Sequence, residues 1–395
     1  MAVHFHPLRL HRIRPEAAGA AVLAFHVPHA LRGDFDFRPG QFLTLRAMLE
    51  GREERRSYSI CSAHQRYVQH GEIEIGIKPV EGGRFSRWAV QTLRPGDTVD
   101  VMPPDGRFTA RDAGARHRVG FAAGSGITPL LSIIATTLAA EAQSYFTLVY
   151  GNQRVGTIMF SEALQDLKDR YPARLALIHL LSRQPQETAL LHGRIDEAKV
   201  DALLRTLLPA QSIDEAFLCG PEGMIDATRR ALLAAGVAPD RVHAERFHSG
   251  SASAPPATGP ATPRACPSAT TADASLRVTQ LQVVLDGKTH SLALGPQDHV
   301  LDAALDAGLD LPYSCKGGVC CTCRARVLEG RVAMDRNFTL EQWEIDAGFV
   351  LTCQARPLTA TLVVSYDPSA RAWKRYAISI ISRSSDECTE AGQAI

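Results

Sequence analysis

The sequence predicts a multidomain fold: an antiparallel β-barrel, then an α/β module with an open parallel sheet, then a small module built on a β-hairpin. Three observations predict it: short alternating strands over residues 1–112, strand–helix alternation over 113–248, and a linker-like segment that sets off residues 276–368. The 395 residues suit two to three domains. With 43 basic and 42 acidic side chains, the chain lacks the basic footprint of a nucleic-acid binder.

The first module consists of short strands separated by turn residues. Apolar and polar residues alternate over Gln41–Arg46 and again over Glu72–Ile77. Turn pairs such as Pro39-Gly40 and Pro95-Gly96 punctuate these runs. Regularly spaced strands of this kind predict an antiparallel barrel.

The second module alternates strands with helices. Apolar strands are expected at Arg118–Ala123, Phe146–Tyr150, Leu175–Leu181 and Ala216–Cys219, and helices at Pro129–Ala140, Ser161–Arg170, Ile195–Leu207 and Pro221–Ala235. This order predicts an open, mostly parallel sheet. The segment between Arg118 and Glu141 is uncharged and long enough to span a bilayer, but its glycines and threonines favour a buried strand, a loop and a core helix. No membrane association is expected.

A change of composition separates the third module. In the 27 residues 249–275, 24 are Ala, Ser, Thr, Pro or Gly, which predicts a flexible linker. The module over 276–368 begins with a hairpin around Asp286-Gly287. A helix over Asp298–Ala307 and a strand over Ala360–Tyr366 complete its expected elements. The tail 369–395 has no predicted role.

Four cysteines of the third module have the spacing of an iron–sulfur site. Cys315, Cys320 and Cys323 read C-x4-C-x2-C, and Cys353 follows 30 positions later, which is the plant-type [2Fe–2S] pattern. The alternatives are a zinc site, which would want a second C-x2-C pair, or free core thiols. Cys321 falls off the spacing and is expected to be a non-ligand. The cysteines cluster, they number nine in all, and no secretory signal is visible. Together these observations predict a reducing, cytoplasmic location.

Two motifs of the first module suit a flavin. In Arg56-Ser57-Tyr58-Ser59, the arginine can hold a pyrophosphate, the tyrosine can stack on a flat ring, and Ser59 can reach the ring edge. In Gly82-Gly83-Arg84-Phe85-Ser86, Gly83 admits close backbone approach, and a helix that begins near Ser86 presents N–H groups to phosphate.

A nucleotide loop is predicted in the second module. Gly124-Ser125-Gly126-Ile127-Thr128-Pro129 follows a strand and begins a helix, so the helix N-terminus can face a pyrophosphate. Arg154 follows the next strand, and Ser182 and Arg183 follow the third, with no acidic residue there to bind a ribose 2′-hydroxyl. This pattern favours NADPH over NADH. The alternative is that both arginines are ordinary solvated residues.

Taken together, these motifs resemble the ferredoxin–NADP reductase family with a fused C-terminal plant-type ferredoxin. The resemblance implies a β-grasp fold for the third module and FAD in the first, with FMN as the alternative. By resemblance Arg56, Tyr58 and Ser59 contact the flavin, Gly83, Phe85 and Ser86 hold its pyrophosphate, and Gly124, Gly126 and Thr128 bind the nucleotide. Cys219, in Cys219-Gly-Pro-Glu-Gly-Met224, and Glu245 are expected beside the nicotinamide, and Phe247 near the flavin ring. Ser59, Cys219 and Glu245 are the candidate catalytic residues.

The resemblance implies an electron path from NADPH to flavin, to cluster, to an external acceptor. The implied acceptor is a di-iron oxygenase of aerobic phenylacetate degradation, because the chain is similar to reductases that serve it. Reductases of other ring oxygenases or of steroid oxygenases are the alternative. Two further hypotheses are a redox sensor with poor turnover and a diaphorase that does not use its cluster.

Overall fold

The computed structural model describes residues 4–110, 114, 116–247 and 278–367, and the predicted linker 249–275 and tail 369–395 lie outside them. Two compact units divide the chain. One contains the described residues up to 247, and the other contains 278–367. No helix among the described residues is both long and apolar enough to cross a membrane.

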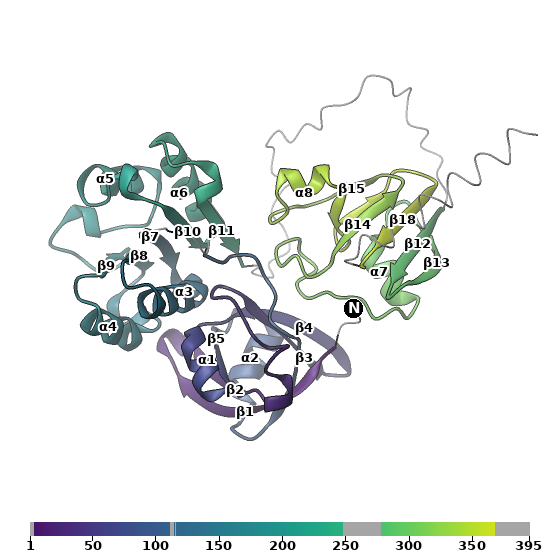
Figure 1. Cartoon of the computed structure of the whole chain (residues 1–395), viewed down its shortest axis with the longest axis horizontal. Coiled ribbons are helices and arrows are strands. Elements are labelled where there is room, and N and C mark those ends of the chain that lie inside the picture. Colours follow the sequence, from purple (N-terminus) through teal and green to yellow (C-terminus); the bar gives the residue numbers. More distant parts are fainter. Residues whose placement is uncertain (1–3, 111–113, 115, 248–277, 368–395) are drawn as a thin grey trace, which may run out of the picture. The chain divides into compact units, whose positions relative to one another are not determined.

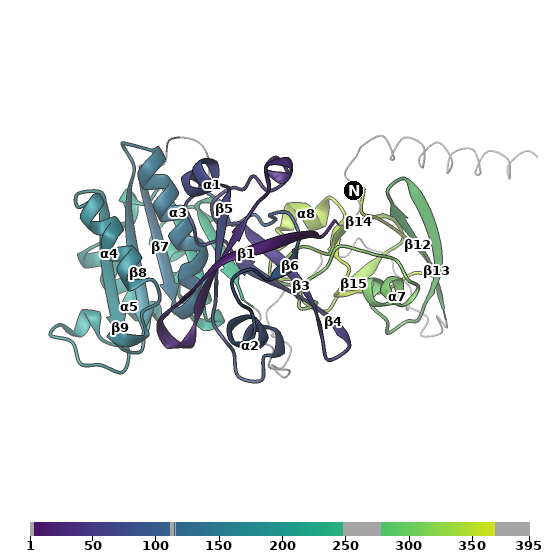
Figure 2. The same cartoon turned by 90° about the horizontal axis from the view of Figure 1, so that it is seen from below.

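The N-terminal part of the first unit is an antiparallel sheet of six strands over residues 4–110, in the order β4-β3-β6-β1-β2-β5. β1, the long purple strand in Figure 2, pairs with β2 on one side and β6 on the other. Ile60, just after β4, forms a bridge with Ile75 of β5, which brings the two edges of the sheet together as the predicted barrel requires. The elements are β1 (His6–Pro15), β2 (Ala21–His26), β3 (Phe42–Leu49), β4 (Arg52–Ser59), α1 (His64–His70), β5 (Glu72–Ile77), α2 (Arg84–Gln91) and β6 (Thr98–Val101).

The second part of this unit is the predicted parallel sheet, in the order β11-β10-β7-β8-β9 over residues 116–247. Helices α3 and α4 pack on one face and α5 and α6 on the other (Figure 1). The fifth strand, β11, was not among the sequence predictions and pairs with β10. The elements are β7 (His117–Ala123), α3 (Ile127–Ala140), β8 (Tyr145–Asn152), α4 (Ser161–Arg170), β9 (Leu175–Leu181), α5 (Glu197–Thr206), β10 (Glu215–Gly220), α6 (Glu222–Ala234) and β11 (Val242–Arg246).

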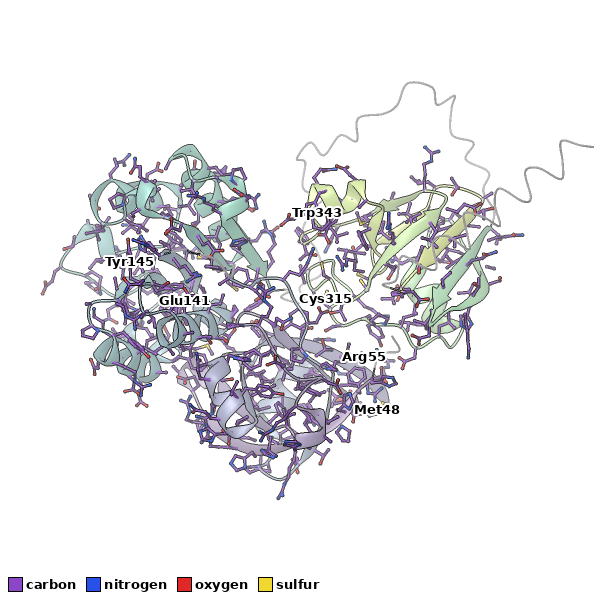
Figure 3. All side chains as sticks on the ribbon, in the orientation of Figure 1. Met48, Arg55, Glu141, Tyr145, Cys315 and Trp343 are labelled. Atoms are coloured by element: carbon purple, nitrogen blue, oxygen red, sulfur yellow. The ribbon has the colours of Figure 1, made fainter. Side chains whose placement is uncertain are left out.

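The amino-terminal edge of this parallel sheet is held by a buried ion-pair cluster. Arg118 is fully buried and contacts Glu215 at 2.9 Å and Glu141 at 2.6 Å. Tyr145, which Figure 3 labels near Glu141, stacks on His117 with ring centroids 4.1 Å apart. Because the opposite, carboxyl-terminal edge carries the glycine turn, this cluster has a structural role.

The described part of the second unit has a mixed sheet in the order β13-β12-β18-β14-β16, two helices that contribute to its core, and a separate two-stranded sheet of β15 and β17, which matches the expected β-grasp fold. Asp286 and Gly287 both have positive φ, as the two-residue hairpin turn requires. The elements within 278–367 are β12 (Thr279–Leu285), β13 (Lys288–Leu294), α7 (Val300–Asp306), β14 (Arg324–Glu329), β15 (Val332–Met334), α8 (Gln342–Asp346), β16 (Phe349–Leu351), β17 (Ala355–Pro357) and β18 (Thr361–Ser365).

Candidate functional site

The flavin motif lies at the end of β4, as its spacing predicted. Ser59 is the last residue of the strand and is buried. The ring of Tyr58 lies 6.1 Å from the Phe85 ring. Arg56 is half-exposed and donates to the Arg55 carbonyl at 2.8 Å and to Glu54 at 3.3 Å. The guanidinium group therefore remains accessible to a ligand beside the strand.

A second arginine joins this site, and sequence reasoning had not selected it. Arg84, the first residue of α2, contacts Glu54 at 3.2 Å, so Glu54 lies between Arg84 and Arg56. No side chain caps the N-terminus of α2. Two guanidinium groups and uncapped N–H groups are a donor set that fits a pyrophosphate. The basic residue inside the Gly-Gly-Arg-Phe-Ser motif was the available signal.

The other residues of this motif have mainly packing roles for their side chains. Phe85 is 1% exposed in the barrel core, and the Ser86 hydroxyl accepts from the Val80 N–H at 3.3 Å. A Cβ on Gly83 would lie 2.4 Å from a Val80 methyl group. Any contact that Phe85 makes with a phosphate would therefore come from its backbone.

The glycine turn of the nucleotide motif fits closely against the neighbouring strand β10. A Cβ on Gly126 would lie 2.1 Å from the Cys219 carbonyl oxygen, so only glycine fits there. Tyr150 donates to the Gly124 carbonyl at 2.8 Å and holds the turn from β8. The N-terminus of α3 carries no side-chain cap and no acidic residue in its first turn. These uncapped N–H groups fit the pyrophosphate of a dinucleotide.

Thr128 lies in this first turn but does not face open solvent. Its side chain is 2% exposed, and its hydroxyl donates to the Ser125 carbonyl at 2.9 Å. A nucleotide contact by Thr128 would therefore use the backbone.

The three candidate catalytic residues come together where the two halves of the first unit meet. The Ser59 hydroxyl of β4 donates to a carboxyl oxygen of Glu245 on β11 at 3.0 Å. Cys219 of β10 is the direct partner of Glu245 in the parallel pairing of β10 and β11. Since the two hydrogen-bonded residues are 186 positions apart, the fold creates this site.

Burial governs the protonation of this group of residues. Burial raises the pKa of the Glu245 carboxyl group to about 8, although the hydrogen bond from Ser59 opposes the shift. Burial also raises the pKa of the Cys219 thiol, and the neighbouring Glu245 charge adds to that effect. At neutral pH both side chains are therefore uncharged, which suits an apolar ring system against them.

Phe247 follows directly after the last residue of β11 and is 39% exposed. Its ring is one of the exposed large apolar groups among the described residues. An exposed aromatic ring two residues after Glu245 suits a surface that a flat ligand would cover.

Arg154, Ser182 and Arg183 lie at the carboxyl ends of β8 and β9. The Ser182 N–H donates to the Asn152 carbonyl and the Arg183 N–H to the Gln153 carbonyl, both at 2.9 Å. This pairing holds the two strand ends side by side, and the side chains of Arg154 and Arg183 are exposed. The structure thus places Arg154 and Arg183 at one edge of the parallel sheet. This location is separate from the Ser59–Glu245 contact.

The four predicted cluster ligands lie in the second unit as two pairs of thiols. Hydrogen bonds join Cys315 to Cys320 and Cys323 to Cys353. Figure 3 labels Cys315 in the loop that carries the first three cysteines. A binuclear cluster takes two thiolates on each of its two irons, which is the arrangement that these pairs offer. As the side chains stand, no group of three or more metal-binding side chains surrounds a single point among the described residues.

Backbone N–H groups favour thiolates at this loop. The Cys320 thiol, together with N–H groups that include that of Gly317 at 3.3 Å, lowers the pKa of Cys315 to about 5. The Cys323 thiol lowers the pKa of Cys353, with help from the Gln354 side chain. The pKa of Cys320 and of Cys323 is raised, because each thiol is hydrogen-bonded to its partner cysteine and is buried. Iron–sulfur clusters bind thiolates, so one sulfur of each pair already has the protonation state that the cluster requires.

The Cys321 side chain makes a different contact from the four predicted ligands. Its thiol donates to the Thr339 hydroxyl at 2.8 Å. This contact supports the prediction that Cys321 is not a ligand.

Comparisons with known proteins match all three modules. Models of an oxidoreductase FAD-binding domain, an oxidoreductase NAD-binding domain and a 2Fe-2S iron-sulfur cluster binding domain match residues 7–110, 121–230 and 283–358. One component of the 1,2-phenylacetyl-CoA epoxidase from Escherichia coli K12 is 44% identical over 371 residues, covering 93% of this chain and 99% of the relative. The chain belongs to the FAD-, NAD- and 2Fe-2S-containing reductase components of oxygenases.

Other members of this reductase family agree. The ferredoxin reductase component of 3-ketosteroid-9-alpha-monooxygenase from Rhodococcus rhodochrous is 35% identical, covering 89% of this chain and 94% of the relative. The solved structure of phthalate dioxygenase reductase has a TM-score of 0.56 at 21% identity, covering 91% of this chain and 98% of that one. This likeness establishes the fold. The protein is an oxidoreductase with the predicted modules.

Proposed function

We propose that this reductase takes electrons from NADPH and delivers them, through FAD and a [2Fe–2S] cluster, to a di-iron oxygenase. The first step of this proposal, transfer from NADPH to FAD, rests on the 3.0 Å hydrogen bond from Ser59 to Glu245. It joins the end of the flavin motif to the strand beside the nucleotide motif. A nicotinamide and a flavin held by these two motifs would therefore face each other there.

When bound, the flavin accepts the hydride that NADPH gives up, and the cluster takes electrons one at a time. Ser59 and Glu245 would lie at the polar edge of the place where that transfer occurs. With its pKa raised to about 8 by burial, Glu245 would place little charge beside the nicotinamide at neutral pH. Arg56, Arg84 and the first turn of α2 would hold the flavin pyrophosphate, while Cys315, Cys320, Cys323 and Cys353 would bind the two irons.

The experiment for this path is an anaerobic reduction of the FAD- and cluster-loaded protein by NADPH. We expect the flavin absorbance to bleach first and the electron paramagnetic resonance signal of a reduced [2Fe–2S] cluster to follow. A protein whose flavin NADPH does not reduce, or which contains zinc in place of iron, would contradict the proposal.

The preference for NADPH over NADH is assigned to Arg154 and Arg183. Both are exposed at adjoining strand ends, where a guanidinium group can bind a 2′-phosphate. We expect Arg154→Gln and Arg183→Gln each to raise KM for NADPH about tenfold or more, since a hydrogen bond to a charged group contributes about 1.5–3 kcal/mol. KM for NADH should not change.

Arg205→Gln on α5 is the matched control, because it removes the same charge from an exposed outer helix. Equal kcat/KM for NADPH and NADH in the unaltered protein would reject the assignment.

The proposed acceptor is the oxygenase of a phenylacetyl-CoA epoxidase, by the 44% identity to a component of that enzyme. The alternative, a steroid oxygenase, follows from the 35% identity to the ketosteroid relative. Coupled turnover decides between them. The reductase is mixed with each oxygenase and its substrate, and product is measured against NADPH consumed. Product from the steroid enzyme alone would favour the alternative.

A further inference from the structure

Gly76 of β5 lies at the contact between the barrel and the nucleotide-binding half of the first unit. It is buried, and a Cβ on it would lie 2.7 Å from the Thr128 methyl carbon and 3.0 Å from Cζ of Phe160. Its φ is not in the left-handed region, so backbone conformation does not demand glycine here. Glycine is required here because two side chains from the nucleotide-binding half approach it closely.

Thr128 connects this contact to the nucleotide turn. It lies two residues after Gly126, in the first turn of α3, and its hydroxyl is bound to the Ser125 carbonyl. Its hydroxyl thus holds the glycine turn while its methyl group enters the space above Gly76. A shift of this methyl group would therefore move the turn.

Phe160 enters the same space at a conformational cost. Its φ is +59°, which is rare for a bulky residue, yet its ring is 2% exposed. Residues in such regions persist where surrounding structure holds them, commonly at functional sites. Phe160 also lines two clefts between the halves, together with Arg14 and Ala163, so Gly76 lies where its ring meets the barrel.

A second connection reaches the glycine turn from Phe160. The Tyr150 hydroxyl donates to the Gly124 carbonyl at 2.8 Å and lies 3.5 Å from the carbonyl oxygen of Met159, the residue before Phe160. Thr128 is therefore linked to the nucleotide turn directly, and Phe160 is linked to it through its neighbour Met159 and the Tyr150 hydroxyl.

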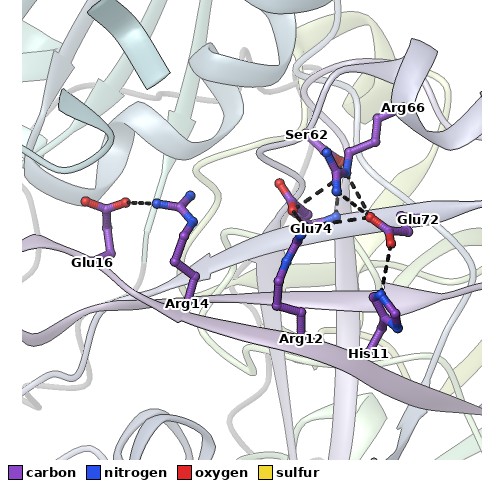
Figure 4. Close-up of polar contacts among 8 residues, drawn as sticks. All are labelled: His11, Arg12, Arg14, Glu16, Ser62, Arg66, Glu72 and Glu74. Atoms are coloured by element: carbon purple, nitrogen blue, oxygen red, sulfur yellow. Dashed lines mark hydrogen bonds and ion pairs between the residues drawn. The ribbon is translucent and has the colours of Figure 1, made fainter. Parts of the chain in front are cut away.

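The strand that carries Gly76 is itself firmly placed. Figure 4 shows Arg66 of α1 and Arg12 of β1 converging on Glu72 and Glu74 of β5, with Arg12 2.7 Å from Glu74 and Arg66 2.5 Å from Glu72. Gly76 also pairs with Val22 of β2. The barrel side of the contact is thus a fixed surface on which the other half rests.

We propose that Gly76 is a positioning residue for hydride transfer: it forms a socket for Thr128 and Phe160 that sets the position of the nucleotide turn relative to the flavin. This inference rests on the proposed transfer from NADPH to flavin. Small misplacements matter for such a step, because about 1 Å can cost on the order of a hundredfold in rate.

The test is Gly76→Ala in the full chain loaded with flavin and cluster. We expect the rate of flavin reduction by NADPH, followed by stopped flow, to fall about tenfold or more. The Kd for NADPH should stay within about twofold, and the primary isotope effect with nicotinamide deuterated at the transferred position should change. Gly33→Ala is the matched control, since its Cβ would meet nothing within 4 Å.

Rescue distinguishes positioning from a general packing defect. Adding Thr128→Ser to Gly76→Ala removes the methyl group 2.7 Å from the new Cβ and keeps the hydroxyl that binds Ser125, so the rate should recover in part. Phe160→Leu in the unaltered Gly76 background covers the case in which Gly76→Ala does not fold, and should also slow hydride transfer.

An unchanged rate and isotope effect in Gly76→Ala would overturn the proposal. So would a slow Gly76→Ala variant that keeps its flavin content but that Thr128→Ser fails to improve. If Gly76→Ala loses its flavin, Phe160→Leu decides, and an unchanged rate in that variant would overturn the proposal. If NADPH fails to reduce the unaltered protein, the proposed function itself is wrong, so the two failures are distinguishable.

Discussion

Glu245 contributes to the pH dependence of the first unit through its raised pKa. Burial raises its pKa from an ordinary value of 4.5 to about 8. Between these values the folded protein keeps a proton that the unfolded chain has lost. The contribution of Glu245 to stability therefore falls as pH rises through this window and levels off above about 8.

We predict that Glu245→Gln removes this dependence, because the amide does not titrate. The melting temperature of the variant, relative to the unaltered flavoprotein, should rise steadily from pH 5 to pH 8. The measurement is thermal unfolding monitored by flavin fluorescence across that range. Glu187→Gln, at an exposed site, is the control and should show a constant difference. A constant difference for Glu245→Gln as well would mean that the carboxyl group is already ionised at neutral pH.

Candidate site residues could be predicted from the sequence where motif spacing indicates them. The four cluster cysteines and the Arg56–Ser59 motif needed no long-range information. The contact between Ser59 and Glu245 could be expected only from the family resemblance, because nothing local indicates that residues 186 positions apart meet. Arg84 was overlooked because its role depends on where α2 begins, and helix ends are set by packing.

At the scale of elements, the glycine turn is the most constrained nucleotide-binding feature. A Cβ on Gly126 would lie 2.1 Å from a backbone oxygen of β10, which cannot move aside as a side chain could. We predict that Gly126→Ala raises the Kd for NADPH more than about tenfold, since the turn must shift away from the strand. Flavin content should stay unchanged, because the flavin motifs lie on other elements.

Equilibrium titration of the nucleotide by flavin difference absorbance checks the prediction for Gly126. Gly33→Ala provides the control, as its Cβ has open space. Undiminished affinity in Gly126→Ala would show that the turn does not hold the nucleotide.

Helix α8 is an element whose stability depends on one buried charge. Glu344 is fully buried, accepts from Arg324 at 2.6 Å and from the Glu341 N–H at 3.1 Å, and so caps the helix while pairing with the residue after Cys323. Arg324 is partly exposed. Removal of its partner therefore costs less unfolding free energy than removal of one partner from a fully buried ion pair. We predict that Glu344→Ala lowers the unfolding free energy of the second unit by about 1–3 kcal/mol.

Denaturant unfolding of the loaded protein, followed by cluster absorbance, measures the effect of Glu344→Ala. Glu329→Ala, at the exposed end of β14, should change stability by less than about 0.5 kcal/mol. If the two variants unfold alike, the ion pair does not stabilise the unit.

Elements with strong patterns were predictable and short ones were not. The hairpin around Asp286-Gly287 and the four apolar strands of the parallel sheet appear where their periodicity placed them. β11 and α8 did not, because Val242–Arg246 has no apolar run and Gln342–Asp346 is a single turn with only a capping pair as signal. Pairing with β10 and the Arg324 contact decide these elements, and both are tertiary interactions.

At the scale of the whole molecule, the division into two units separates two kinds of chemistry. The predicted nucleotide and flavin residues all belong to the unit whose described residues end at 247, and the four cysteines all belong to the other. Hydride transfer therefore needs only the first unit, whereas delivery to an acceptor that draws on the cluster needs both. The sequence indicated this division through composition alone.

This division predicts that a cluster ligand can be removed without loss of flavin chemistry. Cys320→Ser should leave NADPH-dependent ferricyanide reduction within about twofold of the unaltered protein, because the flavin site lies wholly in the first unit. Reduction of cytochrome c through the cluster should fall more than about tenfold, since serine is a poor ligand for this iron centre. Cys266→Ser is the matched control, because Cys266 belongs neither to the C-x4-C-x2-C pattern nor to the predicted ligand set that Cys353 completes. Intact cytochrome c reduction in Cys320→Ser would instead support the diaphorase hypothesis, in which electrons leave from the flavin.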